Sequence, residues 1–156
     1  MTEAEALAVL RGDDPTRVAQ AEAALWAMWC RSGGPELDAG LAEAIAAMEG
    51  RDFAGAERRL TRLIEAAPDW AEAWNKRATV RYLAQDYAGA IADCEETRAR
   101  KPYHFGALAG QGLCHMALAQ YGPAAAMFRR AVEVHPHLDA VRRNLRSALA
   151  EVVRYN

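Results

Sequence analysis

The chain has 156 residues, 52% of them apolar, and a formal net charge of −2. This length suffices for one domain with a continuous core or for three to four small repeats, and the near-neutral charge favours neither nucleic acid nor an anionic membrane as partner. No apolar run is long enough to span a membrane and the acidic start does not resemble a signal peptide, so we expect a cytoplasmic protein without membrane insertion, or a periplasmic one if a signal peptide has been removed.

Residues 1–35 are expected to form a degenerate helix hairpin packed on the rest of the chain. A first helix over 2–11 and a second over 16–31 are separated by a Gly-Asp-Asp-Pro turn, and a Ser-Gly-Gly-Pro run ends the second helix. Trp26 and Trp29 lie three residues apart, on one side of that helix, where we expect them to seal the front of the first repeat. The alternative is a hairpin that swings away and exposes Trp26.

The middle of the chain repeats with a period of 34 residues. A fixed period of this length indicates one supersecondary unit that has been copied and stacked. Each unit ends with a proline, which lacks an N–H and terminates the preceding helix. The prolines are Pro68, Pro102 and Pro136, and the units span 36–69, 70–103 and 104–137.

Other matched positions in the three units predict a pair of antiparallel helices. Small residues recur at two positions, where they let the two helices approach closely, and an aromatic residue recurs near the turn between them. Asp52 and Asp86 precede that aromatic residue and are expected to cap the second helix, whereas Gln120 is a poorer cap. The small residues are Ala44, Ala78 and Gly112 with Ala56, Ala90 and Ala124, and the aromatic residues are Phe53, Tyr87 and Tyr121.

These residues resemble the tetratricopeptide repeat, whose pattern is W-x2-L-G-x2-Y, then A-x3-F, then P. Trp74 is the only tryptophan at its position of the pattern. The segments 74–79 and 101–108 are similar to a bacterial subfamily of small proteins with this repeat. The resemblance implies an all-α fold, a right-handed α-solenoid of helix hairpins that forms one structural domain.

The segment 138–156 is expected to be a helix that caps the solenoid. Asp139 can start this helix, its apolar side would cover the last repeat, and its arginines would face outward. The apolar side consists of Val141, Leu145, Ala148, Leu149, Val152 and Val153.

In the tetratricopeptide family, the first helix of each pair lines a concave face. Carried over to this chain, that rule implies a mainly apolar groove with a polar band in its middle, which suits an extended peptide or an amphipathic helix. The alternative is that these residues pack against one another or against the N-terminal hairpin. The groove residues are Leu41, Ile45, Met48, Asn75, Lys76, Thr79, Tyr82, Leu113 and Met116.

Family members that grip the C-terminal carboxylate of a chaperone use lysine, asparagine and further basic residues at five positions. The five positions here hold Leu41, Ile45, Lys76, Gly106 and Gly110. Because both glycines lack a charged group, we expect no such clamp.

Two arginines lie at positions that normally face the core of a repeat. A buried arginine must be paired, so Arg77 and Arg81 predict a polar seam with Asp93 and Glu95 as counter-ions. We interpret this seam as structural, with ligand binding as the alternative.

The sequence predicts neither catalysis nor a cofactor. His135 and His137 flank a repeat proline, and no further ligand recurs at metal spacing. Cys114 and His115 are adjacent in one predicted helix and point in different directions, which argues against a nucleophile–base pair. With Cys30 and Cys94, the cysteines number three and are expected to be small buried apolar residues.

The expected function is therefore non-catalytic: a protein-interaction module or scaffold that binds a peptide or helix of a partner protein. The alternative is self-assembly into a weak homo-oligomer. The unit 36–69 has eight acidic and four basic residues, whereas the segment 138–156 has two acidic and four basic ones. The acidic end of one molecule could meet the basic end of the next, in a head-to-tail contact that need not close.

Overall fold

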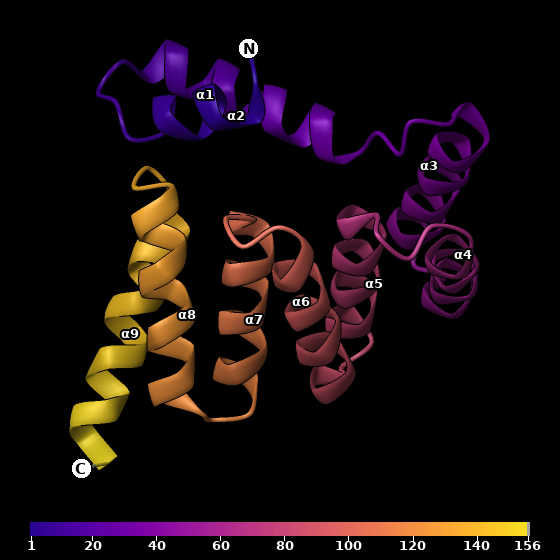
Figure 1. Cartoon of the computed structure of the whole chain (residues 1–156). Coiled ribbons are helices and arrows are strands. Elements are labelled where there is room, and N and C mark those ends of the chain that lie inside the picture. The colour runs from indigo at the N-terminus through magenta and orange to yellow at the C-terminus, as the bar shows by residue number, and fades with distance from the viewer. Residues whose placement is uncertain (156) are drawn as a thin grey trace.

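The computed structural model of the chain describes residues 1–155, which form nine α-helices and no strand. Consecutive helices from α3 to α9 pack side by side in chain order, which confirms the predicted all-α solenoid of helix hairpins (Figure 1). Within the described residues, no helix combines the length and apolar character needed to cross a membrane. The helices are α1 (Glu3–Val9), α2 (Pro15–Trp29), α3 (Pro35–Glu49), α4 (Phe53–Ala66), α5 (Ala71–Leu83), α6 (Tyr87–Arg100), α7 (Phe105–Ala117), α8 (Tyr121–Val134) and α9 (Asp139–Tyr155).

The turn inside each helix pair has the same backbone conformation. Each turn places a residue other than glycine at positive φ, with values of 63°, 65° and 56°. In the first two turns the next residue caps the second helix, since Asp52 and Asp86 accept hydrogen bonds from the N–H groups of Gly55 and Gly89 at 2.9 and 3.0 Å. Gln120 makes no such bond, as its side chain predicts. The residues at positive φ are Arg51, Gln85 and Ala119.

Small residues hold the helices of each pair close together. A Cβ added to Gly112 would come within 2.4 Å of the Phe128 ring, so α7 and α8 can meet here only around a glycine. The alanines at the two matched positions are buried, which confirms the predicted close approach: Ala44, Ala56, Ala78, Ala90 and Ala124.

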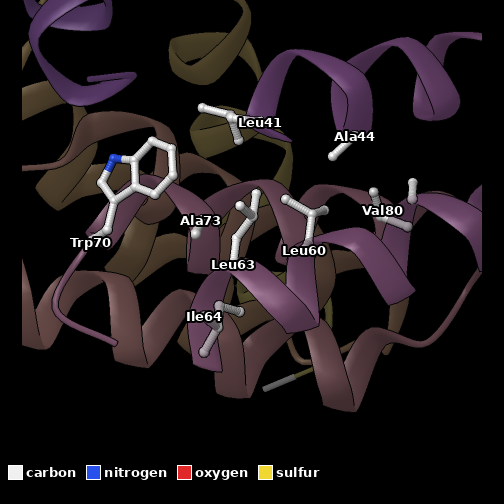
Figure 2. Packing of buried hydrophobic residues seen from close by; sticks show 9 residues of the cluster. Leu41, Ala44, Leu60, Leu63, Ile64, Trp70, Ala73 and Val80 are labelled. Carbon is white, nitrogen blue, oxygen red and sulfur yellow. The ribbon is translucent and has the colours of Figure 1, made fainter. Parts of the chain in front are cut away.

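One apolar cluster joins the first helix pair to the second. Leu41 of α3, Leu60 and Leu63 of α4, and Trp70 and Val80 beside or within α5 lie in it, and all are buried. Figure 2 shows side chains of the three helices gathered in this cluster. Because neighbouring units share this core, each stabilises the next, as stacked repeats do.

The last helix covers the end of the third helix pair. Val141 and Ala148 of α9 are buried in a cluster with Phe128 of α8, as the apolar pattern predicts. Leu149 and Val153, by contrast, are 37% and 79% exposed. The apolar side of α9 is thus wider than the surface that α8 offers to it.

The N-terminal hairpin does not lie where the sequence predicts it. α1 and α2 lie across the ends of the later helices rather than in front of α3 (Figure 1). Their apolar residues form a cluster with Phe105 of α7, Val134 of α8 and Leu138 before α9. The prediction that Trp26 and Trp29 seal the first repeat is therefore wrong, because the apolar surface that matches them belongs to the third unit.

Candidate functional site

A cavity of about 330 Å³ lies between α5 and α7, with α6 contributing to its wall. Four of the nine predicted groove residues line it: Asn75, Thr79, Tyr82 and Leu113. None of its lining side chains carries a charge. The other lining residues are Ala78, Leu83, Cys94, Gly106, Ala109, Gly110 and Cys114.

The cavity exists because α7 carries small residues opposite larger side chains of α5. A Cβ added to Gly110 would meet only the sulfur of Cys94, at 3.7 Å, so this part of the wall has room. The Thr79 hydroxyl donates to the Asn75 carbonyl at 3.1 Å and is already bonded within α5. The Tyr82 ring lies 5.7 Å from the Tyr87 ring, an aromatic pair at one end of the helix hairpin. The site is thus a mainly apolar hollow with few free polar groups.

Five of the predicted groove residues do not line this cavity. Leu41 is buried in the core, and Ile45 and Met48 pack against the same core cluster. Met116 packs against the cluster of α7, α8 and α9. These hydrophobic side chains pack against core clusters of the protein, and Leu113 does so too while it also lines the cavity.

Lys76, the fifth, already has two partners within the chain. Its Nζ lies 3.3 Å from Glu72 Oε1 and 5.2 Å from the centre of the Trp26 ring. A Cβ added to Gly106 would lie 2.6 Å from Trp26 Cη2, so the indole occupies the space that a side chain would fill. The N-terminal hairpin thus covers the end of the groove next to Lys76.

Glu72 and His104 form a buried pair beside Lys76. Both side chains are fully buried, and Glu72 Oε2 lies 2.8 Å from His104 Nε2. His104 Nδ1 accepts the Ala107 N–H at 3.1 Å, so the remaining proton of a neutral ring is on Nε2 and points to the carboxylate. Asn75 donates to the other carboxylate oxygen at 3.0 Å. Asn75, although it lines the cavity, is therefore also committed to Glu72.

The environment of Glu72 favours its charged form. Burial alone would raise the pKa of this carboxyl, but the hydrogen bond from His104, the charge of Lys76 and the Asn75 hydrogen bond together hold the pKa below its ordinary value of 4.5. The repeat period does not predict this pair, because Glu72 and His104 belong to different units. The available signal was His104 itself, a polar residue directly before the first helix of its pair, where the other two pairs have Gly34 and Trp70.

The predicted arginine seam is present, with one different partner. Arg77 Nη2 and Nε each lie 2.9 Å from an oxygen of Asp93, which is 2% exposed. Arg81 pairs with Asp93 at 3.0 Å and with Glu57 at 2.9 Å. Glu95 is exposed, so the prediction that it is a counter-ion is wrong, and Glu57 of the preceding unit replaces it. The hydrogen bonds and charge of Asp93 raise the pKa of Arg77, and the seam joins α4, α5 and α6.

His135 and His137 attach the N-terminal hairpin. His135 Nε2 lies 2.7 Å from Glu22 Oε2 of α2, and His137 Nε2 lies 2.7 Å from the Gly12 carbonyl. Between residues 1 and 155, no group of three or more potential ligands is arranged to hold a metal ion. Both histidines of the His-Pro-His run at the end of the third unit thus have partners in the hairpin.

The three cysteines are free thiols. Burial raises the pKa of Cys114 to about 11 and the pKa of Cys94 further. Burial also raises the pKa of Cys30, which is only partly buried. Thiols with raised pKa values are poor nucleophiles at neutral pH.

Comparisons with known proteins agree with this fold. No family model matches the chain. A TPR repeat-containing protein of Rhizobium etli is 31% identical over 100 residues, which is 64% of this chain and 49% of that protein. The match therefore spans about half the length of this relative.

Solved structures with the same arrangement are domains built of tetratricopeptide repeats. The Sgt2 TPR domain of Aspergillus fumigatus superimposes with a TM-score of 0.75 at 23% identity, over 79% of this chain and 83% of that chain. The first TPR domain of Spaghetti (RPAP3), bound to the HSP90 peptide SRMEEVD, gives 0.73 at 18% identity, over 75% and 93%. An O-GlcNAc transferase of Thermobaculum terrenum gives 0.68 at 23% identity, over 72% of this chain but 22% of the enzyme.

The solenoid is thus a helical repeat array. More specifically, it has the tetratricopeptide-repeat fold, and the resemblance inferred from the 34-residue period is confirmed.

Proposed function

We propose that this protein is a non-catalytic interaction module that binds a peptide or helix of a partner protein in the groove between α5 and α7. The observation that carries the proposal is the uncharged cavity lined by Asn75, Thr79, Tyr82 and Leu113. The neighbour of the same fold that is bound to an HSP90 peptide supports a peptide as ligand. Grooves of this kind bind a peptide or helix through a few of its side chains, which recur at regular spacing.

The lining of the groove indicates what the partner presents. Apolar and small residues dominate it, so the partner gains most by burying apolar side chains. Lys76 is already paired with Glu72 and covered by Trp26, so no free cation is offered to an acidic chain end. The proposed ligand is therefore the apolar face of an amphipathic segment, unlike the acidic peptide of the HSP90 complex.

The state of the reactive groups supports the proposed non-catalytic character. His104 and His135 are buried and each bonds to a carboxylate within the chain. The raised pKa of Cys94 and the pKa of about 11 of Cys114, both caused by burial, keep the two cavity thiols protonated at neutral pH.

The test uses two leucines of the same region. Leu113→Glu places a charge in the cavity, whereas Leu118→Glu changes a leucine that is 41% exposed and lies outside it. A peptide selected from a displayed random library on the wild-type chain should bind the Leu118→Glu chain unchanged and lose at least tenfold in affinity for Leu113→Glu. Thermal unfolding by circular dichroism checks that both variants remain folded. Equal affinity for the two variants would show that the groove is not the site.

Self-assembly remains the second candidate, supported by the exposed apolar surface of α9. Leu149, Val153 and Tyr155 are 37%, 79% and 69% exposed on this arginine-bearing helix. If they contact the acidic first unit of another copy, the mass measured by light scattering should rise with concentration and fall with added salt. A constant monomer mass at both salt levels would eliminate this candidate.

A further inference from the structure

α2 is held on the array by aromatic stacking at the start of α7. The Trp29 ring lies 4.1 Å from the His104 ring at an interplanar angle of 22°, and 5.2 Å from the Phe105 ring. The Trp26 ring meets His104 and Phe105 edge-on, each at 5.5 Å. Such pairs are favourable beyond the area that they bury, so the two indoles anchor α2 together with Val18, Ala21 and Leu25, which are buried in the same cluster.

Charged groups fix the orientation of α2. Lys76 lies above the Trp26 ring at 5.2 Å, and Glu22 bonds to His135 at 2.7 Å. Glu22, Trp26 and Trp29 are spaced at i, i+4 and i+7, which places them on one face of a helix. The array therefore contacts a specific pattern of side chains on α2: a carboxylate followed by two indoles. We call the array surface that contacts these three side chains the docking edge. Its residues are Glu72, Lys76, His104, Phe105, Gly106 and His135.

The docking edge is also shaped for an indole. Gly106 is the second residue of α7, and a Cβ there would lie 2.6 Å from Trp26 Cη2. One turn further along, a Cβ on Gly110 would have ordinary contacts. Glycine at 106 thus provides the space for an aromatic side chain, and the two glycines form a matched pair for mutation.

The array does not depend on α2 for its main cores. The hairpin contributes the buried residues of one cluster, to which the array adds Phe105, Val134 and Leu138. The other two clusters consist almost entirely of array residues, with Cys30 at the margin of one. The link to α3 contains Gly33, at φ 93°, followed by Gly34. When the hairpin leaves, the array loses the bond from the Trp70 indole to the Trp29 carbonyl and the cover over Phe105, but the residues of the other two clusters keep one another as neighbours.

We propose that the docking edge binds an amphipathic helix of a partner protein that presents a carboxylate and two aromatic side chains at i, i+4 and i+7, in competition with α2. The inference goes beyond the groove and does not depend on what binds there. α2 occupies the edge at rest because its tether gives it an effective concentration of about millimolar. A partner helix gains access when the hairpin opens. Its carboxylate and aromatic side chains must have the same spacing as Glu22, Trp26 and Trp29 of α2.

The experiment uses the full chain and a labelled synthetic peptide with the sequence of residues 14–31. In the wild type, the resident α2 competes with the peptide. In the Trp26→Ala/Trp29→Ala chain α2 loses its aromatic anchors and keeps its bond from Glu22 to His135, while the residues of the docking edge are unchanged. Fluorescence anisotropy should show saturable binding to the double variant, at least tenfold tighter than to the wild type.

Array-side substitutions show where the peptide binds. Added to the double variant, Gly106→Ala should abolish peptide binding and Gly110→Ala should preserve it. Leu113→Glu in the groove should leave binding of this peptide unchanged. The docking-edge proposal and the groove proposal can therefore fail independently. If circular dichroism shows that the double variant has lost cooperative melting, the single variant Trp26→Ala takes its place under the same criteria. Absence of saturable binding, equal binding to wild type and variant, or binding that survives Gly106→Ala would overturn the proposal.

Discussion

Glu72 of the second unit and His104 of the third meet at 2.8 Å, with both side chains fully buried. The bond joins the first turn of α5 to the residue that caps α7, since His104 Nδ1 also accepts the Ala107 N–H. Trp29 of the hairpin stacks on the same imidazole at 4.1 Å. One polar pair thus links two repeats and the segment that covers them.

The first prediction concerns Glu72→Gln. The amide keeps the size of the side chain but removes the charge that Lys76 and His104 contact, so we expect a loss of about 1–3 kcal/mol in the free energy of unfolding at pH 7. Urea denaturation followed by circular dichroism measures the loss. Glu43→Gln is the control, because Glu43 pairs with Arg59 at an exposed position and its loss should cost at most about 0.5 kcal/mol.

The same variant tests the pH dependence of stability. The pKa of Glu72 is lowered by its hydrogen bond with His104 and nearby charge against the effect of burial, so its contribution is complete above the ordinary value of 4.5 and disappears as the pH falls through the lowered pKa. The wild type should therefore lose more stability than Glu72→Gln between pH 5 and about pH 3. Parallel stability curves for the two chains over that range would contradict the assignment.

The arginine seam should contribute more to stability than the ion pair at the matching positions of the first unit. Asp93→Asn leaves Arg77 and Arg81 without their shared carboxylate in a partly buried site, at a cost of about 3 kcal/mol. The corresponding pair of the first unit is Glu43 with Arg59, with side chains 66% and 47% exposed. Removing Arg59 by mutation to Met should cost at most about 0.5 kcal/mol. A similar cost for both would mean that the seam contributes no more than a surface pair.

Gly106→Ala predicts a local opening rather than unfolding. The added methyl group conflicts with Trp26, so amide hydrogens of α1 and α2 should exchange faster, while those of α5 and α6 stay protected. Gly110→Ala should leave the hairpin protected and stabilise α7 by about 0.5–1 kcal/mol, because alanine favours a helix interior over glycine. Hydrogen exchange followed by mass spectrometry separates the segments. Unchanged exchange of residues 3–29 in Gly106→Ala would show that Trp26 does not occupy this position in solution.

The thiols offer a prediction about accessibility. Cys94 and Cys114 are buried, and burial raises the pKa of Cys114 to about 11, so both should react with a thiol reagent only on unfolding. Cys30 is partly buried and should react first, although burial also raises its pKa. Peptide mapping after brief labelling at pH 8 identifies the modified residue. Labelling of Cys94 at the rate of Cys30 would contradict the packing between α6 and α7.

The repeats could be predicted from the sequence because their determinants are local. Asp52 and Asp86 lie one residue before the helices that they cap, and Gly112 lies where the period places a small residue. The position of the hairpin could not be predicted in this way. Trp26 is on the predicted side of α2, but its contact with Phe105 joins segments far apart in the chain, and no periodicity encodes that distance.

The groove was predicted in part for the same reason. Thr79 and Leu113 line the cavity because the repeat register places them on facing helices. Ile45 occupies the equivalent register position, yet it packs against the core that α3 shares with α4 and α5. Lys76 is engaged by Glu72 and by Trp26, and the second of these contacts depends on where the hairpin folds.

The most direct test of the proposed groove is chemical-shift mapping by NMR with a peptide selected on the wild-type chain. The perturbed amides should cluster on the cavity-lining stretches of α5 and α7, around Thr79, Tyr82 and Leu113, and the Leu113→Glu chain should show no perturbation at the same peptide concentration. Perturbations confined to α3 and α9, or a map that persists in Leu113→Glu, would contradict the proposal that this groove binds the partner.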